Sequence, residues 1–266
     1  MPLPDRGLAF ASLERRRAMI MAQQTDIVLI LGSGPNAPQA KAWPRAYFDR
    51  IVAINNAWQI REDWDDLVFP EDFPADRRPQ NVLPSQRLVQ ADQFVPTQNA
   101  YGGFVYAGGT MAFTTAYWAL QALRPKVMAF LGCDMVYPKA GPTHFYGTGA
   151  ADPLRADITL QDLGAKSARL GALAAAQGCC CVNLSSEPSE LMFQRAKASD
   201  LREAAFVLPE IRGMDVVLKR EDDLGYFVAT GRYWERDFGF DAQELAGLDA
   251  AWRALWSAGC GMTCAA

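Results

Sequence analysis

The stretch Asp26–Asn36, DIVLILGSGPN, decides how this chain folds. Its first part, Asp26–Leu31, is a continuous apolar run, which is typical of a strand buried on both faces of a parallel sheet. The run ends in the loop Gly32-Ser33-Gly34-Pro35-Asn36, where glycines let the backbone approach an anion or a ribose closely. The sequence therefore predicts an α/β protein that binds a nucleotide-type ligand at this loop. A tight turn without a ligand is the alternative interpretation.

Apolar runs and helical runs alternate along the chain after this loop. We expect further strands near 51–55, 66–69, 126–132 and 179–184, and helices near 110–123 and 158–177. A helix is also possible across 38–48, although Pro44 is expected to break or kink it. This alternation predicts a doubly wound, mainly parallel sheet of the Rossmann-like type. Right-handed crossovers bring the carboxyl ends of such strands to one edge of the sheet. The glycine loop, Asn55, Asp134 and Ser185 should therefore meet at that edge and form a single site.

The domain organisation follows from shifts in composition. Residues 1–24 are interpreted as a charged leader, and residues 25–197 as the nucleotide-binding α/β domain. Within that domain we expect an irregular flap over 70–100, which is rich in Pro, Asp, Arg and Gln, and a Gly/Pro-rich lid loop over 135–157. Residues 198–266, with a helix near 241–257, form a C-terminal helical appendage. It should pack on the sheet or on a second subunit, so a homo-oligomer is one expectation.

Composition excludes several classes of function. The net charge of −4 argues against a nucleic-acid protein, which usually carries a basic face. No apolar run is long enough to predict a membrane span, and no secretory signal is recognisable, so we expect a cytoplasmic protein. Cys179, Cys180 and Cys181 are consecutive, and on a strand they cannot converge on one ion. We expect buried thiols and no metal site.

Three short segments are candidates for nucleotide binding. The first is the glycine loop, through Gly32, Ser33, Gly34 and Pro35. Asn55 and Asn56 end the second strand, where an amide offers both a donor and an acceptor to a ribose or base, although a turn or cap is the alternative. Gly108, Gly109 and Thr110 precede a buried helix, and Thr110 is expected to cap its first turn.

The candidate catalytic residues lie at and after the strand near 126–132. Asp134 ends this strand and is expected to orient a sugar or its own loop. His144 is the chain's single histidine and lies on a loop with glycines at both ends, which suits a general base carried on a closing lid. Tyr137 and Tyr146 flank it, and their hydroxyls could hold a phosphate. For each of these residues a structural role is the alternative.

The ordered set of motifs resembles a known group. The motifs are LILGSGPN, VAINNAW, AGGTMAFTTA, AFLGCDM and PTHFYGTG, and they cover about residues 25–195. This set is similar to the bacterial sialyltransferases that use CMP-sialic acid, to the related MptE-like proteins (6-hydroxymethylpterin diphosphokinase-like), and to phage-associated homologues. The resemblance implies that Gly32 to Pro35, Asn55, Gly109 and Thr110 contact the nucleotide. It also implies that Tyr137 contacts a phosphate. The sialyltransferase histidine aligns nearer Thr148, whereas the phage-associated relatives share the pair Thr143-His144.

The resemblance implies a metal-independent glycosyltransferase that uses a nucleotide-sugar donor, most simply a CMP-sugar, and a glycan acceptor. No cofactor is expected beyond this substrate. One alternative is a pterin or nucleotide diphosphokinase, which would need Mg²⁺ and paired acidic residues. The other is a non-catalytic nucleotide-binding protein of the phage or prophage type.

Overall fold

The computed structural model describes residues 26–137, 141–148, 156–235 and 239–261. They form an α/β fold around a seven-stranded parallel sheet with the strand order β4-β3-β2-β1-β5-β6-β7. The strands are β1 (Ile27–Leu31), β2 (Arg50–Ile54), β3 (Asp66–Val68), β4 (Arg87–Val89), β5 (Val127–Leu131), β6 (Cys180–Asn183) and β7 (Gln194–Arg195). The prediction of a doubly wound, Rossmann-like parallel sheet is confirmed, and each predicted strand is present within two residues of its expected ends.

The strand order reverses between β1 and β5, which pair in register from Ile27–Val127 to Leu31–Leu131. The chain first adds β2, β3 and β4 on one side of β1, and then crosses back to place β5, β6 and β7 on the other side. The chain continues from β1 to η1 on one face of the sheet and from β5 to α5 on the other face. The carboxyl ends of β1 and β5 therefore lie at the position where open α/β sheets bind ligands.

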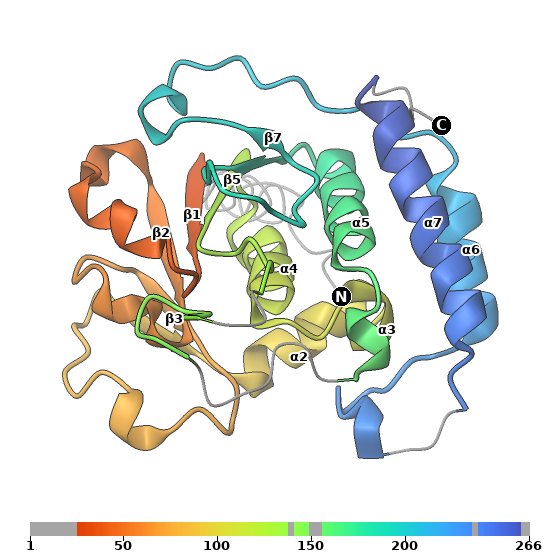
Figure 1. Cartoon of the computed structure of the whole chain (residues 1–266), viewed down its shortest axis with the longest axis horizontal. Helices are drawn as coiled ribbons and strands as arrows, with labels where there is room; N and C mark the ends of the chain where they lie inside the picture. Colours follow the sequence, from red (N-terminus) through yellow and green to blue (C-terminus); the bar gives the residue numbers. More distant parts are fainter. Residues whose placement is uncertain (1–25, 138–140, 149–155, 236–238, 262–266) are drawn as a thin grey trace, which may run out of the picture.

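Two apolar layers cover the two faces of the sheet. Alternate residues of β1 point to opposite cores, because side chains along a strand alternate in direction. One face carries α2 (Ala91–Ala100), α4 (Met111–Leu123) and α5 (Leu163–Ala176), together with the short α3 (Phe104–Ala107). Outside α5 lie α6 (Met214–Leu224) and α7 (Ala242–Gly259), which run side by side in Figure 1. The C-terminal helical appendage thus packs on α5.

The other face is covered by short 3-10 turns. The main ones are η1 (Ala37–Ala42), η2 (Arg45–Tyr47) and η3 (Asn55–Gln59), with η6 (Ala198–Asp200) beside them. The segment 38–48 forms no continuous helix, and the break expected at Pro44 is confirmed. Pro44 has no N–H to donate and separates η1 from η2, so the segment folds as two turns.

The flap expected over 70–100 is the largest correction to the sequence interpretation. Its second half contains β4 and α2, and only the part around η4 (Ala75–Arg77) is irregular. The edge strand β4 is fixed by an ion-pair group across the sheet. The buried Asp66 carboxylate accepts hydrogen bonds from Arg50 at 2.6 Å and from Arg87 at 2.7 Å, so β2, β3 and β4 are tied together.

The helix expected over 158–177 divides into two parts. The turn η5 (Ile158–Leu160) comes first, and α5 begins only after Asp162, whose carboxylate accepts the N–H of Ala165 at 2.8 Å. The leader 1–24 lies outside the described residues, as do parts of the expected lid loop. Within the described part of the chain, no helix is long and apolar enough to cross a bilayer.

Candidate functional site

The two loops that leave β1 and β5 touch each other through glycine backbones. The N–H of Gly32 donates to the Leu131 carbonyl at 2.8 Å, and that of Gly34 donates to the Gly132 carbonyl at 2.9 Å. A Cβ on Gly34 would lie 2.9 Å from the Gly132 carbonyl oxygen, and one on Gly32 would be closer still. These glycines therefore allow the loops to cross at the reversal of strand order. Their N–H groups are already bonded and do not point to a ligand.

Beyond the glycines, side chains from β1, β5 and β6 form a polar cluster at the carboxyl edge of the sheet. The Asn36 amide nitrogen donates to Asp134 and to the Ser185 hydroxyl, each at 2.7 Å. The Ser185 hydroxyl in turn donates to the same Asp134 oxygen at 2.7 Å, and the Asn183 amide donates to the other oxygen at 3.4 Å. Asp134 therefore holds three loops together, as one of the two sequence interpretations expected.

Two amide oxygens at this edge are buried and have no hydrogen-bond partner among the described residues. They are Oδ1 of Asn36 and Oδ1 of Asn55. The orientation of the Asn36 amide is fixed, because only its nitrogen can donate to the Asp134 carboxylate. Asn55 follows β2 and has a left-handed backbone with φ of 51°. A buried acceptor without a partner is costly, so each oxygen is suited to a donor group of a bound ligand.

The amino end of α4 lies near the same edge. Thr110 caps the helix, as predicted, by accepting the N–H of Phe113 at 3.3 Å. Its hydroxyl also lies 3.7 Å from the sulfur of Met135, the residue after Asp134. The first N–H groups of a helix have no partners within it and carry a partial positive charge. This end of α4 is therefore suited to an anion, and Gly108 and Gly109 precede it without bulky side chains.

The loop that carries His144 lies on the glycine loop. The N–H of Phe145 donates to the Ser33 carbonyl at 3.0 Å, and the Phe145 ring packs with the core beneath η1 and η2. The His144 ring stacks on Tyr146 with centroids 5.0 Å apart, and its Nδ1 lies 2.8 Å from the Thr143 hydroxyl. Burial lowers the pKa of His144 below its usual 6.5, which favours the neutral imidazole.

The remaining residues that the sequence predicted for the site differ in how deeply they are buried. Asn56 is buried within η3, and Pro35 is exposed. Tyr137 is half-buried against the core that contains α4, and Tyr146 is 40% exposed beside His144. Residues 138–140 and 149–155 of the expected lid loop lie outside the described residues. No group of three potential metal ligands occurs among the residues that the structure describes.

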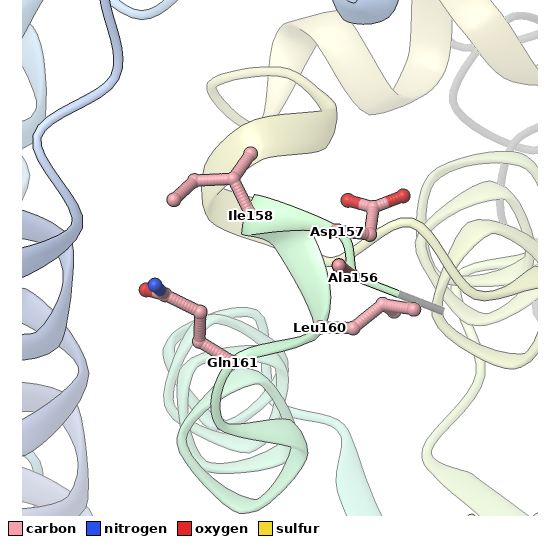
Figure 2. Close-up of a pocket in the computed structure, with 5 residues that line it drawn as sticks. All are labelled: Ala156, Asp157, Ile158, Leu160 and Gln161. Atoms are coloured by element: carbon pink, nitrogen blue, oxygen red, sulfur yellow. The ribbon is translucent and has the colours of Figure 1, made fainter. Parts of the chain in front are cut away.

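A shallow pocket borders the amino end of α4. It has a volume of about 440 Å³ and is lined by Ala156, Asp157, Ile158, Leu160 and Gln161. Figure 2 shows Asp157 and Leu160 extending to one side of the η5 turn and Ile158 and Gln161 to the other. The turn lies against Gly109, where an added Cβ would be 2.5 Å from the Thr159 hydroxyl. The pocket is therefore next to one of the segments expected to bind the nucleotide.

Sequence reasoning missed several residues of this edge. The Asn183 amide donates to Asp134, and it also donates to the Ser189 hydroxyl at 2.9 Å. Asn183 is the last residue of β6 and lies within the run CCCVNL, so its position at a strand end was a usable signal. Asp157 and Tyr233 lie far apart in the sequence, and only the tertiary structure brings them together.

Comparisons of the chain with family models, with curated proteins and with solved structures gave no match. The class of the protein therefore rests on its own fold. It is a Rossmann-like α/β protein with a polar edge at the reversal of strand order.

Proposed function

We propose that this chain binds a nucleotide at the edge between β1 and β5 and transfers a sugar from a nucleotide-sugar, with a CMP-sugar as the donor. The observation that carries the proposal is the pair of unpartnered amide oxygens on Asn36 and Asn55 at this edge of the sheet, to which the amino end of α4 also points. The two amide oxygens can accept hydrogen bonds from O–H or N–H donors, and the amino end of α4 favours an anion. A nucleotide offers both, through its ribose and base on one side and its phosphate on the other.

His144 is the base in this proposal. The mechanism requires the tautomer in which Nδ1–H donates to the Thr143 hydroxyl, 2.8 Å away, because the lone pair then lies on Nε2. The lowered pKa of His144 favours the neutral ring near pH 7. The acceptor hydroxyl oxygen forms a bond to the anomeric carbon, and the bond from that carbon to the nucleotide phosphate breaks. The phosphate leaves with the bonding electrons, and the hydroxyl proton passes to Nε2. Tyr146 stacks on the imidazole and orients it, and Tyr137 is proposed to steady the leaving phosphate.

Binding is tested first. Calorimetric titration with CMP, UMP, GMP and AMP should show saturable binding, with CMP the tightest. Failure of all four nucleotides to bind would overturn the proposal. Binding without turnover would instead favour the non-catalytic nucleotide-binding protein.

Turnover is tested with CMP-sialic acid as the donor, by measuring CMP release. His144→Ala and His144→Gln should each lower the rate by about 10²–10⁴-fold, because neither side chain accepts the proton, while CMP affinity changes little. Turnover should persist in EDTA, because the Asp134 carboxylate is already used by Asn36, Ser185 and Asn183. Loss of turnover in EDTA and its recovery with Mg²⁺ would favour the diphosphokinase class.

A further inference from the structure

Residues 226–235, which follow α6, pack on α2 and α3. The Asn99 amide of α2 donates to the Ala229 carbonyl at 2.7 Å. Gly231 lies so close to α3 that an added Cβ would be 2.8 Å from the Phe104 ring. The segment is therefore anchored on both helices, and it leads the chain toward the residues that precede α4.

The buried Tyr233, at the start of the turn η7 (Tyr233–Glu235), places its hydroxyl against the backbone of Gly109. An added Cβ on Gly109 would lie 3.0 Å from this hydroxyl and 2.5 Å from the hydroxyl of Thr159. The next residue in the chain, Thr110, caps α4. The two hydroxyls therefore pack on the backbone from which α4 begins.

One carboxylate holds both hydroxyls in place. The Tyr233 hydroxyl donates to one oxygen of Asp157 at 2.7 Å, and the Thr159 hydroxyl donates to the other oxygen at 2.7 Å. Asp157 also accepts the N–H of Thr159 at 2.9 Å and so caps η5. Because Asp157 accepts from both side chains, η5 and the C-terminal region act on Gly109 as one unit.

We propose that Tyr233 is a positioning residue of the nucleotide site, and that the C-terminal region is therefore part of this site. Its hydroxyl sets the position of Gly109 and Thr110, and with them the direction of the first N–H groups of α4. This inference rests on the proposed function, in which the amino end of α4 meets the phosphate and the two edge amides meet the ribose and base. Tyr233 thus serves phosphate binding without touching the nucleotide.

The test compares the binding of CMP with that of cytidine, which lacks the phosphate, by calorimetric titration of the full chain. Tyr233→Phe removes the hydroxyl and keeps the ring. This variant should bind CMP about tenfold more weakly and cytidine like the parent, because only the phosphate depends on the amino end of α4. Tyr226→Phe is the matched control, because the Tyr226 hydroxyl accepts the N–H of Asp241 at 3.0 Å instead. The control should bind both ligands like the parent.

Hydrogen exchange measures the positioning itself and needs no ligand. The N–H of Phe113 donates to the Thr110 hydroxyl at 3.3 Å, so its exchange reports on the cap of α4. Followed by NMR, this exchange should be faster in Tyr233→Phe than in the parent, and unchanged in Tyr226→Phe. Equal exchange in all three proteins would overturn the positioning role.

The binding results separate this inference from the proposed function. If the parent binds CMP and Tyr233→Phe binds it equally well, the positioning role is overturned and the proposed function remains. If Tyr233→Phe weakens CMP and cytidine by the same factor, the hydroxyl supports only the fold, and the positioning role is again overturned. If the parent binds neither ligand, the proposed function fails and this inference fails with it.

Discussion

Buried polar groups are satisfied differently on α5 and at the carboxyl edge of the sheet. On α5, the fully buried Arg169 donates to both oxygens of Glu221, at 2.8 and 2.6 Å, and to the Tyr117 hydroxyl at 2.9 Å. Trp252 of α7 donates to the same Glu221 carboxylate at 2.7 Å. At the edge, the oxygens of Asn36 and Asn55 have no partner within the described chain. The Arg169–Glu221 group is thus paired internally, whereas the two amide oxygens at the edge remain unpaired, as do the buried side-chain oxygens of Gln98, Asn99 and Thr115 on α2 and α4.

A second ion pair on α5 qualifies this comparison. Lys166 donates to one oxygen of the buried Asp249 at 2.8 Å, while the other oxygen has no described partner. Burial raises the pKa of Asp249, against the attraction of Lys166. One unpaired atom therefore occurs in the outer layer too, but there it belongs to a carboxylate that is already bound by a cation. The edge differs because its two unpaired amide oxygens follow β1 and β2, where the strand order reverses beside β5.

The largest expected effect concerns the buried ion pair between Arg169 and Glu221. Glu221→Gln should leave the Arg169 cation buried without its anion and should lower the free energy of unfolding by about 3–5 kcal/mol. Urea denaturation followed by circular dichroism measures the change. CMP affinity of the folded fraction should not change, because α6 does not line the edge.

The control for this variant lies on the same helix. Lys219 pairs with Asp223 at 2.8 Å in the solvent-exposed part of α6. Lys219→Ala should therefore leave the unfolding curve unchanged within error. Equal stability of Glu221→Gln and the parent would show that the buried pair does not hold the C-terminal helices on α5.

The second effect concerns the crossing of the two loops. Gly34→Ala would place a methyl group 2.9 Å from the Gly132 carbonyl, so it should destabilise the fold by about 1–3 kcal/mol and weaken CMP binding together. A side chain at Gly34 meets the backbone of the neighbouring loop, so this variant acts on the fold as well as on the ligand site. Pro35→Ala, at the exposed neighbour, should change stability by less than about 1 kcal/mol. Normal stability of Gly34→Ala would contradict the packing role.

The third effect concerns the unpaired amide oxygen of Asn55. Asn55→Gly keeps the left-handed backbone, which glycine adopts freely, and removes only the amide. CMP affinity should fall about tenfold, as expected for one lost hydrogen bond, with little change in stability. Arg124→Gly is the matched control, because Arg124 also has a positive φ, of 48°, but caps the opposite end of α4. If both variants bind CMP like the parent, Asn55 does not contact the nucleotide.

The smallest effect is the pH dependence that His144 contributes. Its pKa is lowered by burial, so the folded protein favours the neutral ring. The stability that this group contributes is therefore present above pH 6.5, the usual value, and is lost as the pH falls through the folded pKa. The rate of CMP release from CMP-sialic acid, followed from about pH 5 to 8, should decline on the acid side with a midpoint below 6.5. The residual rate of His144→Gln should show no such decline. An unchanged acid decline in that variant would assign it to another group.

The sequence by itself determined the sheet and its carboxyl edge. The continuous apolar runs at Ile27–Leu31 and Val127–Leu131 are buried on both faces, and this local signal is independent of the rest of the fold. Glycine turns and polar residues directly after such runs then indicate the carboxyl edge, because parallel strands all end there. The cap at Thr110 was also predictable, since it depends on a hydroxyl and on the helix that follows it within a few residues.

Only the tertiary structure decided what those residues do. The short strand β4 has no apolar pattern of its own and is held by the Asp66 carboxylate of its neighbour. The bonded N–H groups of Gly32 and Gly34 depend on the carbonyls of Leu131 and Gly132, about a hundred residues further along the chain. The contact between Tyr233 and Asp157 likewise joins segments that no local pattern relates. These hydrogen-bond partners are far apart in the sequence and meet only when whole helices and strands pack together. The sequence of a single segment does not specify that packing.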